Sequence, residues 1–510
     1  WRMWWHILKQ ESQFILSHHP VYLGSDVGTS GVKAGFVSQS GEGLLQASSE
    51  YPTYYGPGGQ VEQEPWDWWN AVVQAVQSLT TRSPQLAKQV RSLAVSCQAP
   101  TLLGIDSDGA PVGRGLIWMD RRAEGVCRCV LSPHQDYIHQ YSYNRIDPYY
   151  MLSKLVWQKQ FAPDAYKKTD CYLQINGWIL YQLTGKKLID VSNANLTQFL
   201  NVDTLDWDET IFRLLDLDIQ KMPSIVPCYY SAGPIRPDVA HLLGLPVGTL
   251  VAAGCVDGSA VPYGLGLEEE GAIFEMSGTS SGIGVICDTP YFNPKLSLMK
   301  HVKDDKWFLK GSTSCSGGSL VWFRDKVEQT QDPSCFSVYS ALAEQSVPGA
   351  NGVLFLPYLN GERAPLWDSK LRGVLLGFSS ATEKKDLLRA IMEGTGYALR
   401  TILDEFPIEI VLHSAIHGTG GGYRSRIWSQ IKADILQMPI QVIQQQYDAA
   451  VLGVACIAME AAGTPREHQY ISVPETIYVP DPSSVPVYQK QYPRFRRLYA
   501  ATRDLFHCEE

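Results

Sequence analysis

Two short segments of the chain combine glycines with hydroxyl side chains in a way that suits phosphate binding. Residues 22–37 contain an apolar run that ends at Asp26, a small turn and an alternating run, which predicts strand, tight turn and strand. The turn consists of Gly28, Thr29, Ser30 and Gly31. Because glycine allows backbone angles that other residues avoid, the turn can direct its N–H groups into a concavity that binds an anion. The carboxylate of Asp26 is placed to bind a hydrated Mg²⁺ beside such phosphates.

A second segment of the same type strengthens this interpretation. The first turn alone also fits an ordinary hairpin, and it is not a Walker A loop because no Gly-Lys-Ser/Thr follows. Residues 274–286 repeat the pattern in the other half of the chain, again as strand, turn and strand. The second turn contains Ser277, Gly278, Thr279 and Ser280. Two such hairpins facing each other across a cleft would hold the two ends of a triphosphate.

Polar and aromatic side chains at predicted strand ends suit a sugar. A buried strand over residues 90–96 ends in Gln98 and Ala99, and ligands of α/β sheets bind at such strand ends. A second apolar stretch delivers Trp118, Asp120 and Arg121 to a strand end. An aromatic ring packs on the C–H groups of a sugar while a carboxylate accepts its hydroxyl protons. The alternative is a core tryptophan next to a surface ion pair.

Asp257 is the candidate general base. It ends a strand of small residues, and Gly254 and Gly258 on either side allow another group to approach the backbone closely. A single Asp before Gly is most often a turn residue. Because the second hairpin follows within about 20 residues, Asp257 is also well placed in the sequence to orient a hydroxyl group and accept its proton.

A glycine-rich turn predicts the place of a flat base. Gly420, Gly421 and Gly422 follow a strand pattern and open a helix that runs to about Leu436. Three glycines remove the side chains from one surface, so adenine can lie against it near the helix N-terminus. A flexible linker is the alternative, which the flanking strand and helix patterns disfavour. Asp448 heads a further helix of small residues over 449–462.

Size and composition indicate an α/β enzyme with two domains. The 510 residues exceed what one core usually organises, and 45% are hydrophobic. The net charge is −9 and no basic stripe occurs, which argues against nucleic acid as a partner. Eleven irregularly spaced cysteines favour reduced, buried thiols in a cytoplasmic protein. Cys127-Arg-Cys129 suggests a metal site, but no complementary pair occurs, so we interpret these cysteines as structural.

The ends of the chain carry little chemistry. Residues 1–20 are rich in Trp and lack the apolar core and the small residues of a signal peptide, so we interpret them as an extension. No run of 18 apolar residues occurs, which excludes a transmembrane span of the usual kind. The last 30 residues are rich in Pro and Tyr and then basic, and we expect them to pack back as a terminal helix.

The order of these features resembles the FGGY family of carbohydrate kinases, within the sugar kinase, Hsp70 and actin superfold. The resemblance covers nearly all of residues 21–470. Its most specific pieces are Gly24 to Lys33, Ile117-Trp-Met-Asp-Arg-Arg122, Gly254-Cys-Val-Asp257, Ser277-Gly-Thr-Ser280, Gly361-Glu-Arg363, Gly373-Val-Leu-Leu-Gly377 with Arg389 and Glu393, and Gly420-Gly-Gly-Tyr-Arg-Ser425.

The resemblance implies an α/β protein with two ribonuclease H-like, actin-like ATPase domains and a cleft between them. We expect an N-terminal extension over 1–20, an N-terminal FGGY domain with the sugar and first phosphate loop over 21–265, and an ATP-binding C-terminal FGGY domain over 266–470. Residues 471–510 then pack back onto the protein. The implied cofactors are ATP and Mg²⁺.

The same resemblance assigns residues to roles. Asp257 matches the catalytic base and Asp26 the carboxylate associated with Mg²⁺. The implied nucleotide-binding residues are Gly28, Thr29, Ser30, Lys33, Gly278, Thr279, Gly420, Gly421, Gly422, Ser425 and Asp448, the last in the adenosine region. The implied substrate-binding residues are Gln98, Ala99, Trp118, Asp120, Arg121 and Asp257. The xylulokinase branch carries Gln-Met-His-Gly where this chain has Cys97-Gln-Ala-Pro100, so the histidine that would contact the ketose is missing.

The sequence therefore predicts a xylulokinase-like enzyme that phosphorylates a terminal hydroxyl of a pentulose or a related polyol with Mg-ATP. Two alternatives stay open: an actin- or Hsp70-like ATPase, and a catalytically silent sugar sensor. Trp118, Asp120 and Asp257 disfavour the ATPase, which needs none of them. The partner is a small-molecule sugar, without nucleic acid or membrane, and a homodimer is allowed.

Overall fold

The computed structural model describes residues 20–332, 334–443, 448–464 and 476–507. Except for Pro20, the predicted extension lies outside these residues. The chain folds as two compact units. Among the described residues, unit 1 comprises 20–267, 299–306 and 448–464, and unit 2 comprises 268–298, 307–332, 334–443 and 476–507.

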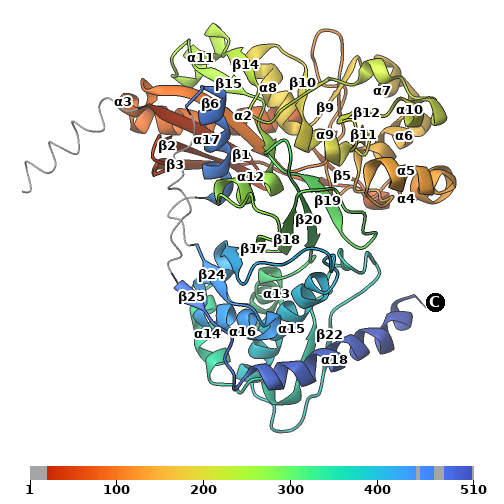
Figure 1. Cartoon of the computed structure of the whole chain (residues 1–510), viewed down its shortest axis with the longest axis vertical. Coiled ribbons are helices and arrows are strands. Elements are labelled where there is room, and N and C mark those ends of the chain that lie inside the picture. The colour runs from red at the N-terminus through yellow and green to blue at the C-terminus, as the bar shows by residue number, and fades with distance from the viewer. Residues whose placement is uncertain (1–19, 333, 444–447, 465–475, 508–510) are drawn as a thin grey trace, which may run out of the picture. The chain divides into compact units, whose positions relative to one another are not determined.

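Unit 1 is built on a mixed seven-stranded sheet (Figure 1). Its strands are β1 (Val21–Val27), β2 (Gly31–Ser38), β3 (Gly43–Glu50), β6 (Val90–Cys97), β14 (Ser231–Pro234), β15 (Leu250–Ala252) and β16 (Cys255–Val256). Strands β1, β2 and β3 form an antiparallel meander, and β6 lies parallel to β1 on its other side. Both β15 and β16 pair with β6 in parallel, and β14 pairs with β15 in antiparallel orientation. The predicted strand–turn–strand at residues 22–37 is thus confirmed.

Helices cover both faces of this sheet, which explains why every residue of β1 is buried. Val21 and Leu23 belong to the core that includes α2 (Pro65–Arg82) and α8 (Ile175–Thr184), whereas Tyr22 packs with residues of α17 (Ala449–Ala461). Tyr22 points the opposite way because side chains alternate along a strand. Helix α17 therefore belongs to unit 1, although residues 268–298 and 307–443 of unit 2 precede it in the sequence.

Local sequence signals position these helices as expected. Pro65 occupies the first turn of α2, Gly185 ends α8 with φ +75°, and the Asp448 carboxylate caps α17 by accepting from the Ala450 N–H. Helix α17 packs closely on α12 (Asp257–Gly264), because a Cβ at Gly453 would lie 1.9 Å from the Ala260 carbonyl oxygen. The small residues of α17 thus serve helix packing.

A second core of unit 1 lies among short helices and small sheets. The remaining helices of unit 1 are α3 (Pro84–Ala87) and α11 (Pro237–Leu243), which contribute to the first core, and α4 (Glu124–Val126), α5 (Gln135–Ser142), α6 (Met151–Phe161), α7 (Pro163–Lys168), α9 (Val191–Thr197) and α10 (Glu209–Leu214). The short strands are β4 (Tyr54–Tyr55), β5 (Val61–Gln63), β7 (Leu103–Ile105), β8 (Gly115–Leu116), β9 (Cys171–Leu173), β10 (Leu188–Asp190), β11 (Leu200–Asn201), β12 (Asp206–Trp207) and β13 (Ser224–Val226).

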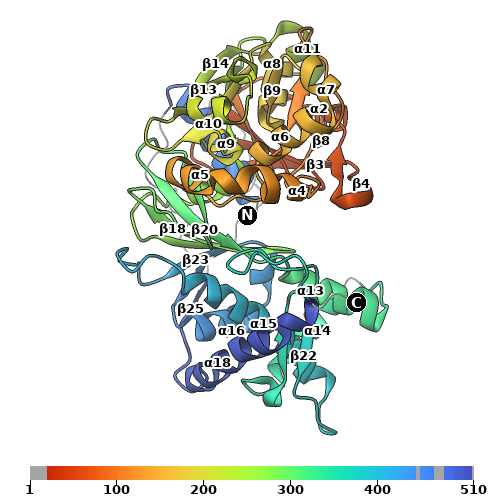
Figure 2. The ribbon, with the colours of Figure 1, turned by 90° about the vertical axis from the view of Figure 1, so that its right-hand side faces the viewer.

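Unit 2 contains a second sheet of seven strands. These are β17 (Ile273–Ser277), β18 (Ser281–Cys287), β19 (Ser297–Lys300), β20 (Trp307–Ser312), β23 (Ile416–Thr419), β24 (Ile440–Val442) and β25 (Thr476–Tyr478). Its helices are α13 (Gly317–Trp322), α14 (Cys335–Glu344), α15 (Lys384–Leu403), α16 (Arg426–Leu436) and α18 (Val485–Thr502), and a two-stranded sheet joins β21 (Leu354–Leu356) to β22 (Val374–Leu376). Helices α15, α16 and α18 lie side by side (Figure 2) and share one core with α14 and β21. The predicted C-terminal helix is confirmed as α18.

The two large sheets repeat one topology. In unit 2, β17, β18 and β20 form an antiparallel meander, β23 lies parallel to β17, β24 parallel to β23, and β25 antiparallel to β24. The same succession links β1, β2, β3, β6, β15 and β14 in unit 1. In each sheet the first hairpin turn lies next to the carboxyl end of the parallel neighbour, where ligands of α/β sheets bind.

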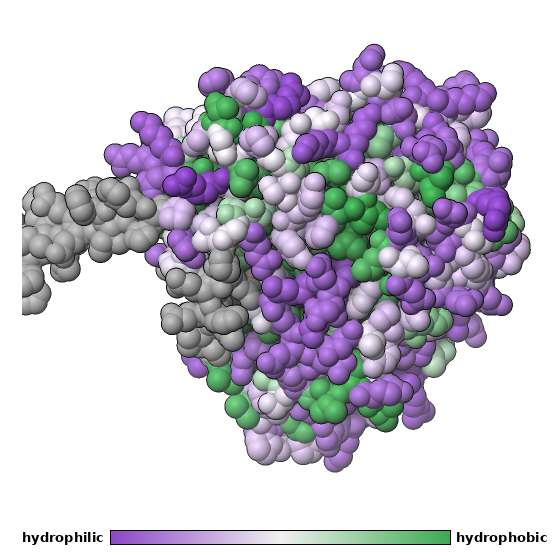
Figure 3. Space-filling view, turned by 45° about the horizontal axis from the view of Figure 1, so that its top comes forward, coloured by the Kyte–Doolittle hydropathy of each residue, from purple (hydrophilic) through white to green (hydrophobic). Residues whose placement is uncertain are grey.

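On the face in Figure 3 polar side chains predominate, and apolar side chains form small groups among them. Among the described residues, no helix has the length and hydropathy that a membrane crossing requires. The ten described cysteines are free thiols, and all except Cys127 and Cys129 are buried.

Candidate active site

The turn between β1 and β2 has its carbonyl groups tied to the interior of unit 1. The carbonyl of Gly28 accepts from the Tyr51 hydroxyl, and the carbonyl of Thr29 accepts from Nε2 of Gln63 at 2.8 Å. In a trans peptide the C=O and the N–H point in opposite directions. The N–H groups of Thr29 and Ser30 therefore point away from these interior partners. This arrangement supports the predicted anion cradle.

A cluster of acidic groups lies beside this turn. The Asp26 side chain is 9% exposed and accepts from the Ser96 hydroxyl at 2.7 Å. Burial and the negative charges of Asp448 and Asp257 raise the pKa of Asp26 to about 7, while Ser96 and Lys33 act in the opposite direction. A cation bound here would offset this repulsion.

Lys33 and Asp448 form an ion pair, with Nζ donating to Oδ2 at 2.6 Å. Burial lowers the pKa of Lys33, but Asp448 and Asp26 outweigh it, so that the pKa is raised. The sequence assigned Asp448 to the adenosine region. In the structure it caps α17 and pairs with Lys33 in unit 1, close enough to Asp26 to affect its pKa. Its contact with adenosine stays a prediction.

Asp257 lies at the carboxyl end of a parallel strand, as predicted, and is the first residue of α12. Strand β16 pairs with β6 so that Cys255 is opposite Ser96, while Asp26 of β1 is opposite Ser96 on the other side. The Val256 N–H, one residue before Asp257, donates to the Ser192 hydroxyl at 3.0 Å. Adjacent strands and this hydrogen bond thus position Asp257 near Asp26.

Gly254 makes this strand arrangement possible. Its φ is +85°, in the left-handed region that glycine adopts readily, and a Cβ there would lie 2.0 Å from the Val95 carbonyl oxygen of β6. The close backbone approach predicted at Gly254 is therefore confirmed, and the group that approaches is the neighbouring strand.

The predicted sugar segment joins the phosphate turn through hydrogen bonds. Nε1 of the half-buried Trp118 donates to the Thr29 hydroxyl at 3.3 Å. The Gln98 side chain is 2% exposed and donates to Oε1 of Gln63 at 2.7 Å, while the Ala99 carbonyl accepts from the Tyr149 hydroxyl at 3.0 Å. The structure thus brings Gln98 and Trp118 to the turn, and their contact with a sugar stays a prediction.

Asp120 does not fit its predicted role as a sugar ligand. It is fully buried, and its oxygens accept from the Val61 N–H at 2.7 Å and from the Arg122 guanidinium at 2.8–3.0 Å. Both oxygens are engaged inside the protein, so this carboxylate holds the segment in place and does not reach a hydroxyl. Arg121 is 38% exposed and pairs with Asp147 at 2.6 Å.

The hairpin of unit 2 repeats the geometry of the first turn. The Gly278 carbonyl accepts from the Gly317 N–H at 3.0 Å, and the Thr279 carbonyl accepts from the Ser316 and Gly318 N–H groups at 2.8 and 2.9 Å. By the same peptide geometry, the N–H groups of Thr279 and Ser280 point away from the segment 316–318. Both predicted phosphate turns therefore direct two successive N–H groups outward.

The glycine-rich turn packs against the base of this second hairpin. Cβ atoms at Gly420 and Gly422 would lie 2.5 Å from the Ser277 carbonyl oxygen and 2.1 Å from the Ser277 hydroxyl oxygen, whereas one at Gly421 would meet no atom within 4 Å. Ser425 caps α16, its hydroxyl accepting from the Trp428 N–H at 3.3 Å. The predicted turn and helix start are confirmed, and two of the glycines serve close packing.

Sequence reasoning missed Gln63, which joins the parts of the unit 1 site. Its fully buried amide donates to Thr29 and Thr53 and accepts from Trp68 and Gln98 at 2.7–2.9 Å. The residue ends β5, two positions before Pro65 begins α2. Its four partners come from separate segments, so no local pattern could have revealed them.

Comparison with known proteins identifies the family. Residues 21–264 match the model of the N-terminal domain, and residues 276–462 the model of the C-terminal domain, of the FGGY family of carbohydrate kinases. The chain belongs to the FGGY family. This FGGY kinase is 29% identical to the xylulose kinase of Bacillus subtilis (strain 168) over 95% of this chain and 97% of the relative. It is also 29% identical to the gluconokinase of that organism, over 86% of this chain and 87% of the relative.

Solved structures show the same fold. Ligand-bound xylulose kinase from Lactobacillus acidophilus matches with a TM-score of 0.88 at 25% identity, over 95% of this FGGY kinase and 98% of that chain. Gluconate kinase from the same organism matches with a TM-score of 0.87 at 24% identity, over 95% and 98%. The predicted two-domain, actin-like ATPase fold is thus confirmed, and the protein is a carbohydrate kinase. The exact domain boundaries stay a prediction.

Proposed function

We propose that this carbohydrate kinase transfers the γ-phosphoryl group of ATP to a terminal hydroxyl of a pentulose or a related polyol, with Asp257 as the base. The observation that carries the proposal is the shared position of Asp257 and the turn at Gly28–Ser30. Both lie at the carboxyl ends of strands in unit 1, β16 and β1, that flank β6 on its two sides, with Ser96 of β6 between them in the register. A turn that can bind phosphate and a side chain that can accept a proton are thereby close to each other.

The residues around Asp26 fit Mg²⁺. The described residues contain no group of three or more His, Cys, Asp or Glu side chains arranged to hold a metal. Magnesium in phosphoryl-transfer sites needs only one or two carboxylates, since water and phosphate oxygens complete its shell. Asp26 would bind the ion, whose charge would neutralise the phosphates. The bound ion would also offset the repulsion of Asp26 by Asp448 and Asp257.

In the proposed reaction, Asp257 accepts the proton of the sugar hydroxyl while the hydroxyl oxygen bonds to the γ-phosphorus. The bond from this phosphorus to the bridging oxygen breaks, and ADP leaves. In unit 1 the outward N–H groups of the first turn would bind phosphate beside Asp257, and in unit 2 those of the second turn would bind phosphate beside Gly420–Gly422, which would receive the base. Since the transition state is loose, most of the catalysis consists of positioning and charge neutralisation.

Two substrate classes follow from the relatives. A xylulose kinase supports a pentulose, and a gluconokinase of equal identity makes gluconate the second candidate. At the strand end where the xylulokinase branch has Gln-Met-His-Gly, this chain has Gln98-Ala-Pro with a buried glutamine. A coupled ADP-release screen over pentuloses, hexuloses, alditols, linear autoinducer-type diols and gluconate would name the substrate.

Replacing Asp257 tests the mechanism. We expect Asp257→Ala to abolish sugar phosphorylation, by about a thousandfold or more, because general-base and positioning contributions are both lost. ATP binding measured by calorimetry should stay close to that of the wild type, since Asp257 touches the hydroxyl and not the nucleotide. Unchanged turnover would contradict the assigned base. ADP release independent of sugar would favour the ATPase alternative, and sugar binding without ADP release the sensor.

Three expectations from the sequence stay predictions: a cytoplasmic location, the absence of a nucleic-acid partner and a homodimer. Sedimentation of the purified enzyme would test the last.

A further inference from the structure

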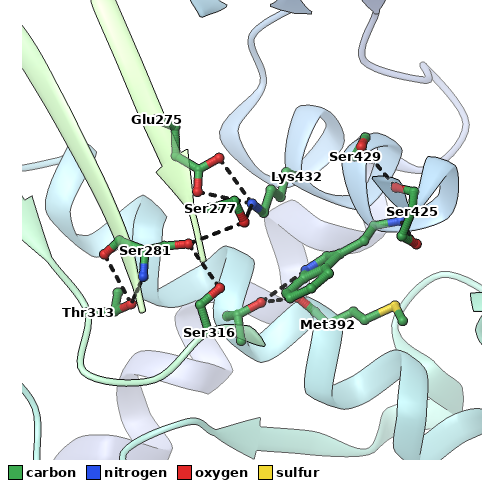
Figure 4. A network of polar contacts seen from close by, with 11 residues as sticks. Glu275, Ser277, Ser281, Thr313, Ser316, Met392, Ser425, Ser429 and Lys432 are labelled. Atoms are coloured by element: carbon green, nitrogen blue, oxygen red, sulfur yellow. Dashed lines mark hydrogen bonds and ion pairs between the residues drawn. The ribbon is translucent and has the colours of Figure 1, made fainter. Parts of the chain in front are cut away.

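Beneath the second hairpin, unit 2 contains a fully buried ion pair (Figure 4). Lys432 of α16 donates from Nζ to both carboxylate oxygens of Glu275 in β17, each at 3.0 Å. The two side chains are 1% and 0% exposed. Neither residue had a role in the sequence-based site.

The third contact of the ammonium group leads to the hairpin. Nζ of Lys432 donates to the hydroxyl of Ser277 at 2.7 Å, the shortest of its three hydrogen bonds. The ammonium also lies 4.4 Å from the ring centroid of Tyr423 and 5.2 Å from that of Trp428. An ammonium group has three N–H donors, so its capacity is used completely. The hydrogen bonds and rings together fix its position.

Ser277 is the point where the hairpin and the glycine-rich turn meet. It directly precedes Gly278, and a Cβ on Gly422 would lie 2.1 Å from its hydroxyl oxygen. The Ser281 hydroxyl oxygen lies 3.5 Å from the Ser277 hydroxyl oxygen and 2.9 Å from that of Ser316, and its one hydrogen can serve either contact (Figure 4). A shift of Ser277 would therefore move both the outward N–H groups and the surface formed by Gly420–Gly422.

A buried ion pair adds little net stability to the contact between a strand and a helix. The desolvation of two charges opposes their attraction, and apolar residues of similar volume often hold a fold equally well. What an apolar pair cannot supply is a directed donor to Ser277. The value of Lys432 at this position therefore lies in the geometry it imposes.

We infer that Lys432 is a positioning residue of the nucleotide site, which fixes Ser277 and thereby sets the phosphate hairpin relative to the glycine-rich turn. This inference rests on the proposed function, because it takes both segments as parts of one ATP site. Lys432 touches neither the nucleotide nor the sugar.

The test separates positioning from stability. In the double variant Glu275→Leu/Lys432→Met no unpaired charge is left buried, so it should fold with a melting temperature near that of the wild type. It should bind Mg-ATP about tenfold more weakly in calorimetry, because the directed hydrogen bond is lost. The KM for ATP should rise equally, and the KM for the sugar at saturating ATP should stay unchanged. Ser277→Ala, which keeps the ion pair, should weaken ATP binding in the same direction.

A second buried ion pair of unit 2 provides the control. Nε of Arg389 lies 2.8 Å from Oε1 of Glu393 within α15, and the pair is 5% and 1% exposed. The Arg389 guanidinium donates to Ala343, Ser346 and Tyr488, none of which belongs to the hairpin or the glycine-rich turn. Arg389→Met/Glu393→Leu should change stability without changing ATP affinity.

Three results would overturn the inference: wild-type ATP affinity in the Glu275→Leu/Lys432→Met variant, wild-type affinity in Ser277→Ala, or an equal loss of affinity in the Arg389→Met/Glu393→Leu control. A wild-type protein that binds no ATP would overturn both this inference and the proposed function. ATP binding without sugar phosphorylation would overturn the proposed function alone, because the effect of Lys432 on ATP affinity would still be measured.

Discussion

Replacing Asp26 by Asn should stabilise the metal-free protein at alkaline pH and leave its stability unchanged at acidic pH. The pKa of Asp26 is about 7 against an ordinary value of 3.8. Each pKa unit corresponds to about 1.4 kcal/mol, so the ionised carboxylate costs the folded state roughly 4 kcal/mol above pH 7. The half-exposed Lys33 can turn toward an ionised Asp26 and reduce this cost, and we expect a measured gain of about 2 to 4 kcal/mol.

The sign of the pH dependence follows from the raised pKa. Near pH 4 Asp26 is neutral in the folded state, whereas about half of the unfolded chains have already lost this proton. Between about pH 4 and 7 the unfolded chain loses this proton while the folded state retains it, so wild-type stability falls as the pH rises. Asn has nearly the same size and still accepts from Ser96, so the variant lacks only the charge.

Urea unfolding at pH 4.5 and pH 8, with EDTA, measures both ends of this window. The stability difference between Asp26→Asn and the wild type should be small at pH 4.5 and grow toward pH 8. Adding Mg²⁺ at pH 8 should stabilise the wild type and not the variant, because the cation offsets a charge that only the wild type carries. The reasoning is refuted if the variant is less stable at pH 8, or if the difference is the same at both pH values.

Two further substitutions test the framework of unit 1. Gln63→Leu should raise the KM for ATP about tenfold and lower the free energy of unfolding by about 1 to 3 kcal/mol, because it leaves the Thr29 carbonyl and the Trp68 N–H without this partner. Steady-state kinetics measure the first effect and urea unfolding the second. An unchanged KM would show that the turn keeps its shape without Gln63. Gly254→Ala should lower the free energy of unfolding by about 3 kcal/mol or more, since its Cβ would lie 2.0 Å from the Val95 carbonyl oxygen at φ +85°. Gly185→Ala, at φ +75° with open space around it, should lower it by only about 1 kcal/mol in the same unfolding assay. Equal losses in the two variants would contradict the steric argument.

The sequence predicts well those features that depend on neighbouring residues. The turn at Gly28–Ser30, the end of α8 at Gly185 and the cap of α17 at Asp448 each follow from local chemistry, and the structure contains all three. The order of the motifs also points to the correct family. Such features need only the backbone preferences of a few consecutive residues.

Features that depend on distant pairs were not predictable in this way. Lys33 and Asp448 are 415 positions apart, yet their side chains lie 2.6 Å apart. Asp120 was interpreted as a sugar ligand because its type and position suit one. Its partner Val61, 59 positions away, became evident only when the chain was folded. A carboxylate at a strand end looks the same in sequence whether it faces a ligand or an arginine.

The two phosphate turns differ in the groups that bind their carbonyl oxygens, so we expect substitutions to affect the two turns differently. In unit 1 the donors are the side chains of Tyr51 and Gln63, whereas in unit 2 they are backbone N–H groups of residues 316–318. A substitution can remove a side-chain donor but leaves a backbone donor in place. Gln63 also accepts from Gln98 at the predicted sugar strand end, so a substitution of Gln98 removes a hydrogen bond to the residue that holds the first turn. We therefore expect substitutions that alter sugar preference to affect phosphate binding through unit 1, while the hairpin of unit 2 depends on Ser277 and the lysine behind it.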